Sequence, residues 1–263
     1  MGTKQEQIRD GIKMAVCASG GGHAGGSLSI ADILASLYGH VMKHNPQVPD
    51  WKDRDRLILS KGHSGLALYS ALAVSGYFPI EELKKFGSAG ARLMNHPDSH
   101  TTPGVEMSTG SLGHGLPLAV GIAFAGQLKK QDYFTYCILG DGECCEGSVW
   151  EAAMAADAQQ LKRLVVVVDR NGIGNDGHLE NIVQIEPLAD KWRSFGFAVE
   201  EVNGHDVQAM NALFMHQREE AQGPYAVIAH TVKGKGLIET IAGTGSSHYL
   251  SGTQDSLKQK FDF

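Results

Sequence analysis

The sequence lacks any long hydrophobic run, and no apolar stretch approaches the ~18 residues that suggest a transmembrane helix. The stretch MGTKQEQIRD at 1–10 is polar and has no signal-peptide core. A basic cluster is also missing, since 23 Lys and Arg stand against 29 Asp and Glu. These absences argue against a membrane span, secretion and a nucleic-acid footprint. An anionic ligand would have to be held by local devices such as helix N-termini, histidines or a metal ion.

Cysteine and proline are scarce, whereas glycine is abundant. The four cysteines, Cys17, Cys137, Cys144 and Cys145, have no CxxC spacing, which is typical of reduced thiols rather than a disulfide framework. Together with the polar start of the sequence, this predicts a cytoplasmic protein. The chain has 33 glycines and 8 prolines, which indicates tight turns and close backbone approaches rather than disorder.

Apolar patterns that alternate between the periods of helices and strands predict the fold. The run LVVVVD at 164–169 is rich in β-branched residues, of the kind that parallel sheets bury on both faces. Strands are expected at 57–60, 133–139, 164–169, 197–202 and 225–230, and helices at 4–18, 27–43, 64–75, 80–86, 116–130, 143–160 and 206–220. This order predicts an α/β fold, a doubly wound, mostly parallel sheet flanked by helices, in one domain spanning residues 1–263. Ser29 is the candidate N-cap of the second helix, and the irregular segment 87–111 is long enough to suggest a function.

Two motifs point to sites that their context does not support. Gly20, Gly22 and Gly25 satisfy GxGxxG, but the preceding segment is helical and no suitable acid follows about 20 residues later, so a dinucleotide fingerprint is not expected. A tight glycine loop that carries an exposed His23 is the better interpretation. The stretch HPDSH at 96–100 lacks a partner cluster at zinc spacing, and a zinc site is not expected there.

Polar residues directly follow two neighbouring predicted strands. Asp141 stands between two glycines at the end of one strand, Asn171 ends the next, and 28 residues separate Gly142 from Asn171. Open α/β sheets bind ligands at the carboxyl ends of their strands. A carboxylate, an amide oxygen and a backbone carbonyl from the Asn-Gly-Ile turn would suit Mg²⁺ and leave positions for phosphate oxygens. A helix that opens near Glu143 would favour an anion at the same place. Either half alone could instead be an ordinary strand-end turn.

This G-D-G…N pattern is the signature of thiamin-diphosphate enzymes, and the chain resembles the N-terminal, diphosphate-binding half of a transketolase. The resemblance spans residues 19–236 and is carried, in the family's order, by "GGHAGGSLS", "DRLILSKGHSGLALYSAL", "NHPDSHTTPGVEMSTGSLGHGLPLAVGIA", "LGDGECCEGSVWEAA", "VVVVDRNGIGNDG" and "HTVKGKG". It implies the thiamin-diphosphate-binding fold, thiamin diphosphate and Mg²⁺ as cofactors, and transfer of a two-carbon ketol unit from a ketose to an aldose.

The resemblance also implies roles for individual residues. Asp141, Asn171 and the carbonyl of Ile173 would ligate Mg²⁺. Gly142, through its N–H, and His63 would contact the diphosphate, and Leu112 and Gly113 would form the loop at the aminopyrimidine. Glu146 would be the acid at the interface between halves that tunes the activating glutamate. The donor-sugar channel would be lined by three histidines that bind hydroxyls and move protons, namely His23, His96 and His248.

Three features depart from the family's pattern. His114 stands where the family usually has Gln, and Asn175 stands where an apolar residue usually packs near the cofactor. The segment 237–249 differs in composition from the common pattern. These departures affect the expected shape of the pocket and the placement of His248, but they leave the metal ligands unchanged.

A transketolase also has a pyrimidine-binding domain, which supplies the glutamate that activates the cofactor, and a further C-terminal domain. Neither follows in this sequence, so the resemblance implies the N-terminal subunit of a split transketolase that works with a C-terminal subunit, in a heterotetramer. A decarboxylating relative, such as a 1-deoxyxylulose-5-phosphate synthase or a 2-oxoacid dehydrogenase component, is the alternative enzyme. A non-catalytic cofactor-binding half-protein is the alternative outside catalysis. The sequence does not identify the sugar substrate, which could carry a phosphate, a sulfonate or no anionic group.

Overall fold

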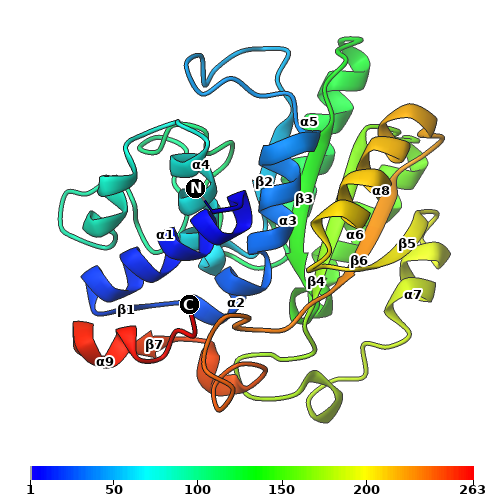
Figure 1. The fold of residues 1–263 in the computed structure, drawn as a ribbon. Coiled ribbons are helices and arrows are strands. Elements are labelled where there is room, and N and C mark those ends of the chain that lie inside the picture. Colours follow the sequence, from blue (N-terminus) through cyan, green and yellow to red (C-terminus); the bar gives the residue numbers. More distant parts are fainter. Residues whose placement is uncertain (1) are drawn as a thin grey trace.

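The computed structural model describes residues 2–263, and its centre is a five-stranded parallel sheet (Figure 1). The strands lie in the order β2-β3-β4-β6-β5, and each neighbouring pair is parallel. Their bounds are β2 Arg56–Leu59, β3 Thr135–Gly140, β4 Leu164–Arg170, β5 Ala198–Asn203 and β6 Tyr225–His230. The predicted α/β fold with a mostly parallel sheet is therefore confirmed, and all five expected strands form.

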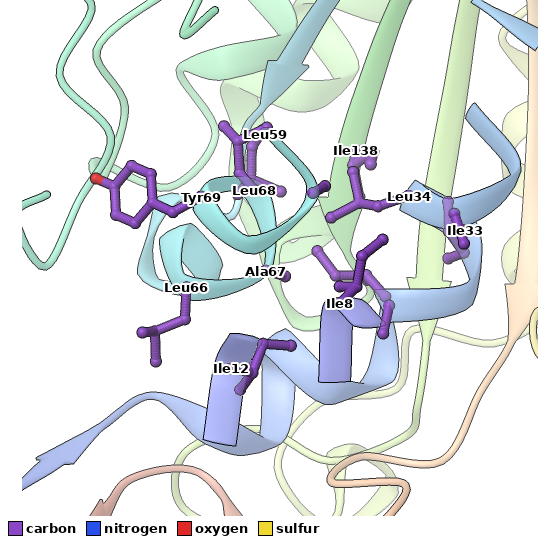
Figure 2. Packing of buried hydrophobic residues seen from close by; sticks show 14 of the residues in the cluster. Ile8, Ile12, Ile33, Leu34, Leu59, Leu66, Ala67, Leu68, Tyr69 and Ile138 are labelled. Carbon is purple, nitrogen blue, oxygen red and sulfur yellow. The ribbon is translucent and has the colours of Figure 1, made fainter. Parts of the chain in front are cut away.

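Alternate residues of the central strands enter two separate cores, because side chains of a strand point to opposite faces in turn. Val165 and Val167 of β4 join one core, whereas Val166 and Val168 join the other. The first core contains residues of α1, α3, α4 and α8, and Figure 2 shows Ile8 of α1 and Leu34 of α3 near Ile138 of β3. The second contains residues of α5, α6 and α7. Helices thus cover both faces of the sheet, as the unbroken apolar run of β4 predicts.

The helices follow the expected order with some additions. Their bounds are α1 Lys4–Ser19, α2 Ala24–Ser29, α3 Ala31–Ser36, α4 Gly65–Val74, α5 Gly115–Leu128, α6 Gly147–Ala158, α7 Leu188–Ser194, α8 Val207–Glu220 and α9 Gln254–Lys258. The helices α7 and α9 and the antiparallel pair of β1 Gly21–Gly22 with β7 Leu250–Ser251 were not expected. Segment 87–111 contains no helix or strand, as predicted. No helix within residues 2–263 has both the length and the apolar character that crossing a membrane requires.

The single helix expected over 27–43 is wrong. It is divided into α2, α3 and a π-helical turn, Leu37–Val41. Ser29 is not an N-cap but the last residue of α2, and its hydroxyl donates to Oδ2 of Asp169 at 2.6 Å. The side chain of Ser29 is thus bonded to a buried carboxylate instead of capping the start of a helix. Local periodicity cannot reveal a contact of this kind. The expected helix 80–86 is a 3₁₀ helix, Ile80–Lys85.

Candidate active site

The candidate site is a cavity of about 520 Å³ at the carboxyl ends of β3 and β4. Asp141 directly follows β3 and Asn171 directly follows β4, and the two strands are neighbours in which Gly140 pairs with Asp169. The sequence-predicted residues that line this cavity are His63, Leu112, Asp141, Gly142, Asn171, Ile173 and His248. The fold therefore brings together segments that are far apart in the sequence.

Asp141 is a buried carboxylate that has no cation partner among residues 2–263. The residue is only 3% exposed; its Oδ1 accepts from the N–H of Gly142 at 2.8 Å and its Oδ2 from that of Gly172 at 2.6 Å. Burial and the nearby Asp169 raise the pKa of Asp141 to about 6. Asp141 belongs to no ion pair within residues 2–263. Its negative charge would be stabilised by a cation in the cavity.

Asn171 is oriented by Asp169, a residue that sequence reasoning did not assign to the site. The amide Nδ2 of Asn171 donates to Oδ2 of Asp169 at 3.0 Å, and Oδ1 of Asn171 accepts from the N–H of Ile173 at 3.1 Å. The fully buried Asp169 also accepts from Lys61 Nζ at 2.5 Å and from Thr231 Oγ1. Burial alone would raise the pKa of Asp169, but Lys61 and these hydrogen bonds lower it overall. Asp169 is therefore a fixed anion that positions Asn171.

Lys233, in the stretch HTVKGKG, lies in the wall of the cavity and was also missed. It is 4% exposed, and its Nζ donates to the carbonyl oxygens of Ile173 at 2.9 Å and Gly174 at 2.8 Å. Burial, and then the charge of Lys61, lower the pKa of Lys233 to about 8. Lys233 forms no ion pair within residues 2–263, whereas Lys61 is paired with Asp169. The carbonyl of Ile173, which the resemblance assigns to the metal, thus already accepts one hydrogen bond, and its second lone pair is available.

The rings of His23, His63, His96 and His248 form a cluster at the cavity, which His63 and His248 line. The ring centroid of His23 lies 5.7 Å from that of His63, 6.4 Å from that of His96 and 5.3 Å from that of His248. Burial is the main cause that lowers the pKa of three of them, to about 2 for His63 and about 4 for His248, with a downward shift for His23 as well. These three rings are therefore neutral near pH 7. His23 is half-buried, not exposed as the glycine-loop interpretation expected, and it follows the short strand β1.

His248 has a buried Nδ1 without a hydrogen-bond partner within residues 2–263. A buried imidazole nitrogen of this kind is costly unless a ligand or water satisfies it. His100, by contrast, has a largely exposed side chain, with its Nδ1 3.6 Å from Oδ1 of Asp98. The structure thus separates the two histidines of HPDSH, because only His96 contacts the cluster.

Leu112 and Gly113 lie in a tight loop before α5. Gly113 has φ +79°, its N–H donates to Oε1 of Glu143 at 2.9 Å, and its carbonyl accepts from Ser148 Oγ at 2.9 Å. A Cβ on Gly113 would stand 2.5 Å from Ser148 Oγ and 2.6 Å from Cβ of Glu146, so no other residue fits. Leu112 lines the cavity, whereas the exposed Glu146 lies beside Gly113 at the start of α6.

This sequence matches a known protein family over nearly its whole length. A family model described as "Transketolase, thiamine diphosphate binding domain" matches residues 5–261. The chain belongs to the transketolase family.

Curated transketolases include proteins of similar length to this chain. A 6-deoxy-6-sulfo-D-fructose transketolase subunit, SqwG of Clostridium sp. (strain MSTE9), is 45% identical and is aligned over 91% of this chain and 86% of its own length. An apulose-4-phosphate transketolase subunit of Phocaeicola vulgatus is 38% identical over 89% of this chain and 83% of its own length. The predicted resemblance to an N-terminal subunit of a split transketolase, and with it transketolase activity, is confirmed.

Solved transketolases have the same fold. The R525L mutant from Pichia stipitis matches with a TM-score of 0.91 and 33% identity over 98% of this chain, and the Campylobacter jejuni transketolase matches with a TM-score of 0.90 and 32% identity. This chain spans only 40% and 41% of those two chains. The transketolases named here favour ketol transfer over the decarboxylating alternative.

Two of the departures from the transketolase pattern lie in the cavity or next to one of its lining residues. Asn175 lines it and donates through Nδ2 to Oδ1 of Asp176 at 2.9 Å. His114 is exposed and precedes α5, with its Nδ1 3.1 Å from the carbonyl oxygen of Leu112. Asn175 therefore brings a polar amide to the cavity where the family usually has an apolar residue, whereas His114 replaces one polar residue with another.

Proposed function

We propose that the cavity binds thiamin diphosphate together with Mg²⁺. The observation that carries this proposal is the pair of unmatched buried charges: the Asp141 carboxylate has no cation and the Lys233 ammonium has no anion within residues 2–263, although both line one cavity. Each is costly to bury alone. A magnesium diphosphate supplies the cation to Asp141 and the anion to Lys233, so the residues present fit this group.

Specific residues would hold the two parts of this ligand. Oxygen atoms of Asp141, Asn171 and the Ile173 backbone suit Mg²⁺, which prefers carboxylate and carbonyl oxygens. Lys233, His63 and the backbone of Gly142 would lie at the diphosphate, and Leu112 and Gly113 at the aminopyrimidine. Since both polar backbone groups of Gly113 are already bonded, we propose that this glycine shapes the loop and that Leu112 makes the contact.

Bound thiamin diphosphate supplies the carbanion chemistry by which ketol groups are transferred. The chain's own contribution lies in the neutral histidines. His23 and His248, whose pKa values lie below their ordinary range, can accept a proton from a sugar hydroxyl at neutral pH. His96 would bind a hydroxyl of the donor beside them. The unpartnered Nδ1 of His248 supports such a contact.

The proposed substrates are a ketose donor that carries an anionic group and an aldose acceptor. The names of two relatives include a sulfo-sugar and a sugar phosphate, and this supports an anion on the donor for this chain too. Sulfonate and phosphate donors would be compared directly in the assay.

The proposed partner is a C-terminal transketolase subunit with a pyrimidine-binding domain, and the proposed assembly is a cytoplasmic heterotetramer. Residues 1–263 of this chain would form a single diphosphate-binding domain. Two relatives are themselves named as subunits. Ile182 and Val183 line the cavity and are 53% and 40% exposed. This apolar rim would be covered by the partner's domain, and Glu146 would lie close to the same interface.

Binding of the cofactor to the Asp141→Ala variant tests the proposal. The complex of this chain with its partner would be titrated with thiamin diphosphate at increasing Mg²⁺, and the fluorescence of the protein recorded. Wild type should bind the cofactor in a Mg²⁺-dependent manner, and Asp141→Ala should lose that dependence because its only carboxylate ligand is gone. Asp190→Ala, which changes an exposed acid of α7, serves as the control. Tight Mg²⁺-dependent retention by Asp141→Ala would refute the metal site.

A further inference from the structure

Three separate segments contribute residues to the lining of the cavity, and one buried side chain joins them. They are the loop after β2, the loop before α5 and the end of β3. Glu143 lies where they meet: Oε1 accepts from the Ser60 hydroxyl and from the N–H of Gly113 at 2.9 Å, and Oε2 accepts from the N–H of Gly140 at 3.1 Å. Ser60 and Gly113 belong to different loops and Gly140 to the end of β3, and Ser60 is 83 residues away from Glu143 in the sequence.

Glu143 is an expensive residue to bury at this position. It is 3% exposed and belongs to no ion pair within residues 2–263. Burial is the main cause that raises its pKa, and the three hydrogen bonds oppose that shift. A glutamine or an apolar residue of similar size would avoid the cost of burying a charge. A carboxylate nevertheless suits this position, because all three of its partners are hydrogen-bond donors and only a carboxylate can accept hydrogen bonds at both oxygens.

The contact with Gly113 has the most direct consequence for the cavity. Glu143 holds the N–H of Gly113 and Ser148 holds its carbonyl, so both peptide groups that flank this residue are fixed in rotation. The preceding residue, Leu112, lines the cavity. The other oxygen of the same carboxylate, Oε2, accepts from the N–H of Gly140, and Gly140 directly precedes Asp141 in the sequence. One side chain thus fixes both the loop of Leu112 and the strand end that carries Asp141.

We propose that Glu143 is a positioning residue that sets the distance between the Leu112 loop and Asp141 before the cofactor binds. This rests on the proposed function, since the two sites would receive the two ends of one molecule, the aminopyrimidine and the diphosphate. A ligand held at both ends binds well only if its two sites are kept at the matching separation. Glu143 acts through Gly113 and Gly140 and itself takes no part in the chemistry.

The test replaces Glu143 with glutamine, which keeps the shape but turns one acceptor into a donor. Facing three donors, the amide group cannot satisfy all of them. In the cofactor-free protein we expect amide hydrogen exchange at Gly113 and Gly140 to become at least tenfold faster, while exchange in α1 and α4 stays within twofold of wild type. In the complex with the partner, the dissociation constant for thiamin diphosphate at saturating Mg²⁺ should rise at least tenfold. At saturating cofactor, kcat and KM for the sugars should return to within threefold.

Two further variants make the result decisive. Ser60→Ala removes one donor without placing a new group in the cluster, and it should produce smaller changes in the same direction. It can be measured even if Glu143→Gln fails to fold. Glu151→Gln changes an exposed carboxylate of α6 and should change none of these quantities. Unchanged exchange at Gly113 and Gly140 in folded Glu143→Gln, or in Ser60→Ala where the first variant does not fold, would overturn the proposal. Because exchange is measured without cofactor, a wild-type complex that failed to bind thiamin diphosphate would instead contradict the proposed function.

Discussion

The side-chain amide of Asn171 donates to the carboxylate of Asp169 across 3.0 Å, so the residue predicted to bind a metal is held by a residue two positions earlier in β4. The same carboxylate balances the charge of Lys61, which also donates to the carbonyl of Gly26 at 3.0 Å. Asp169 therefore connects β4 with the loop after β2 and with α2. Two lining residues of the cavity, Lys61 and Asn171, are thus held by this buried anion.

Asp169→Asn should destabilise the cofactor-free chain strongly. It leaves Lys61 as a buried cation without its partner, a change that typically costs about 3–5 kcal/mol. The free energy of unfolding in urea measures the loss. Asp190→Asn, which removes a pair with Arg193 on the exposed surface of α7, should have a far smaller effect. Equal effects of the two substitutions would contradict the role given to Asp169.

Lys233→Met should weaken thiamin diphosphate binding by at least tenfold, because the diphosphate would lose a buried ammonium partner. The dissociation constant is obtained by titrating the complex with cofactor at saturating Mg²⁺. Lys235→Met is the matched control, since Lys235 lies in the same segment but is exposed. If both variants bound the cofactor as tightly as wild type, Lys233 would not contact it.

Acid should destabilise the cofactor-free chain through His63. Burial lowers the pKa of His63 to about 2 in the folded state, from an ordinary value of 6.5. Between these values the unfolded chain binds a proton that the folded chain does not, so stability is present above pH 6.5 and is lost as the pH falls, by up to about 1.4 kcal/mol per pH unit. Asp141 acts in the opposite sense, because its folded-state pKa is raised to about 6.

The difference between wild type and His63→Gln isolates this effect. Urea unfolding of both proteins at pH 7.5, 6.5 and 5.5 would give the two slopes. The stability of His63→Gln should fall less with acid than that of wild type. Parallel curves would mean that His63 is protonated to the same extent in the folded and unfolded states.

His23→Ala should lower kcat/KM for the donor sugar at least a hundredfold, the usual scale for losing an acid–base group. The affinity for thiamin diphosphate should stay within threefold, because His23 contacts the other histidines beside the cavity and is not among the residues that line it. Steady-state kinetics with saturating cofactor separate the two effects. His100→Ala, at an exposed side chain, should retain full activity.

Residues at the ends of strands were predictable from sequence. The run that became β4 is apolar at every position from 164 to 168 and ends in polar residues, and parallel strands place such ends at one edge of a sheet. Asp141 and Asn171 follow from this rule together with the family's motif. The two-sided burial of the sheet follows from the same apolar run.

The residues that balance charge inside the site were not predictable. Lys233 stands in TVKGKG beside a second lysine that is exposed, and nothing local distinguishes the buried one. Asp169 directly follows the apolar run of β4, which was a usable signal, but its partner Ser29 is 140 residues away. The Ser29 hydroxyl lies within hydrogen-bond distance of both Asp169 and the carbonyl of Gly26, and it caps no helix start. Tertiary context of this kind overrides local preference.

Ketol transfer tests the account most directly. Release of the aldose product from a ketose phosphate or a ketose sulfonate would be measured with an aldose acceptor, thiamin diphosphate and Mg²⁺, first with this chain alone and then in a mixture with its C-terminal partner. The account predicts transfer only in the mixture, and its loss when Mg²⁺ is removed with a chelator. Transfer by this chain alone at the rate of the mixture, or transfer that persists without Mg²⁺, would contradict it.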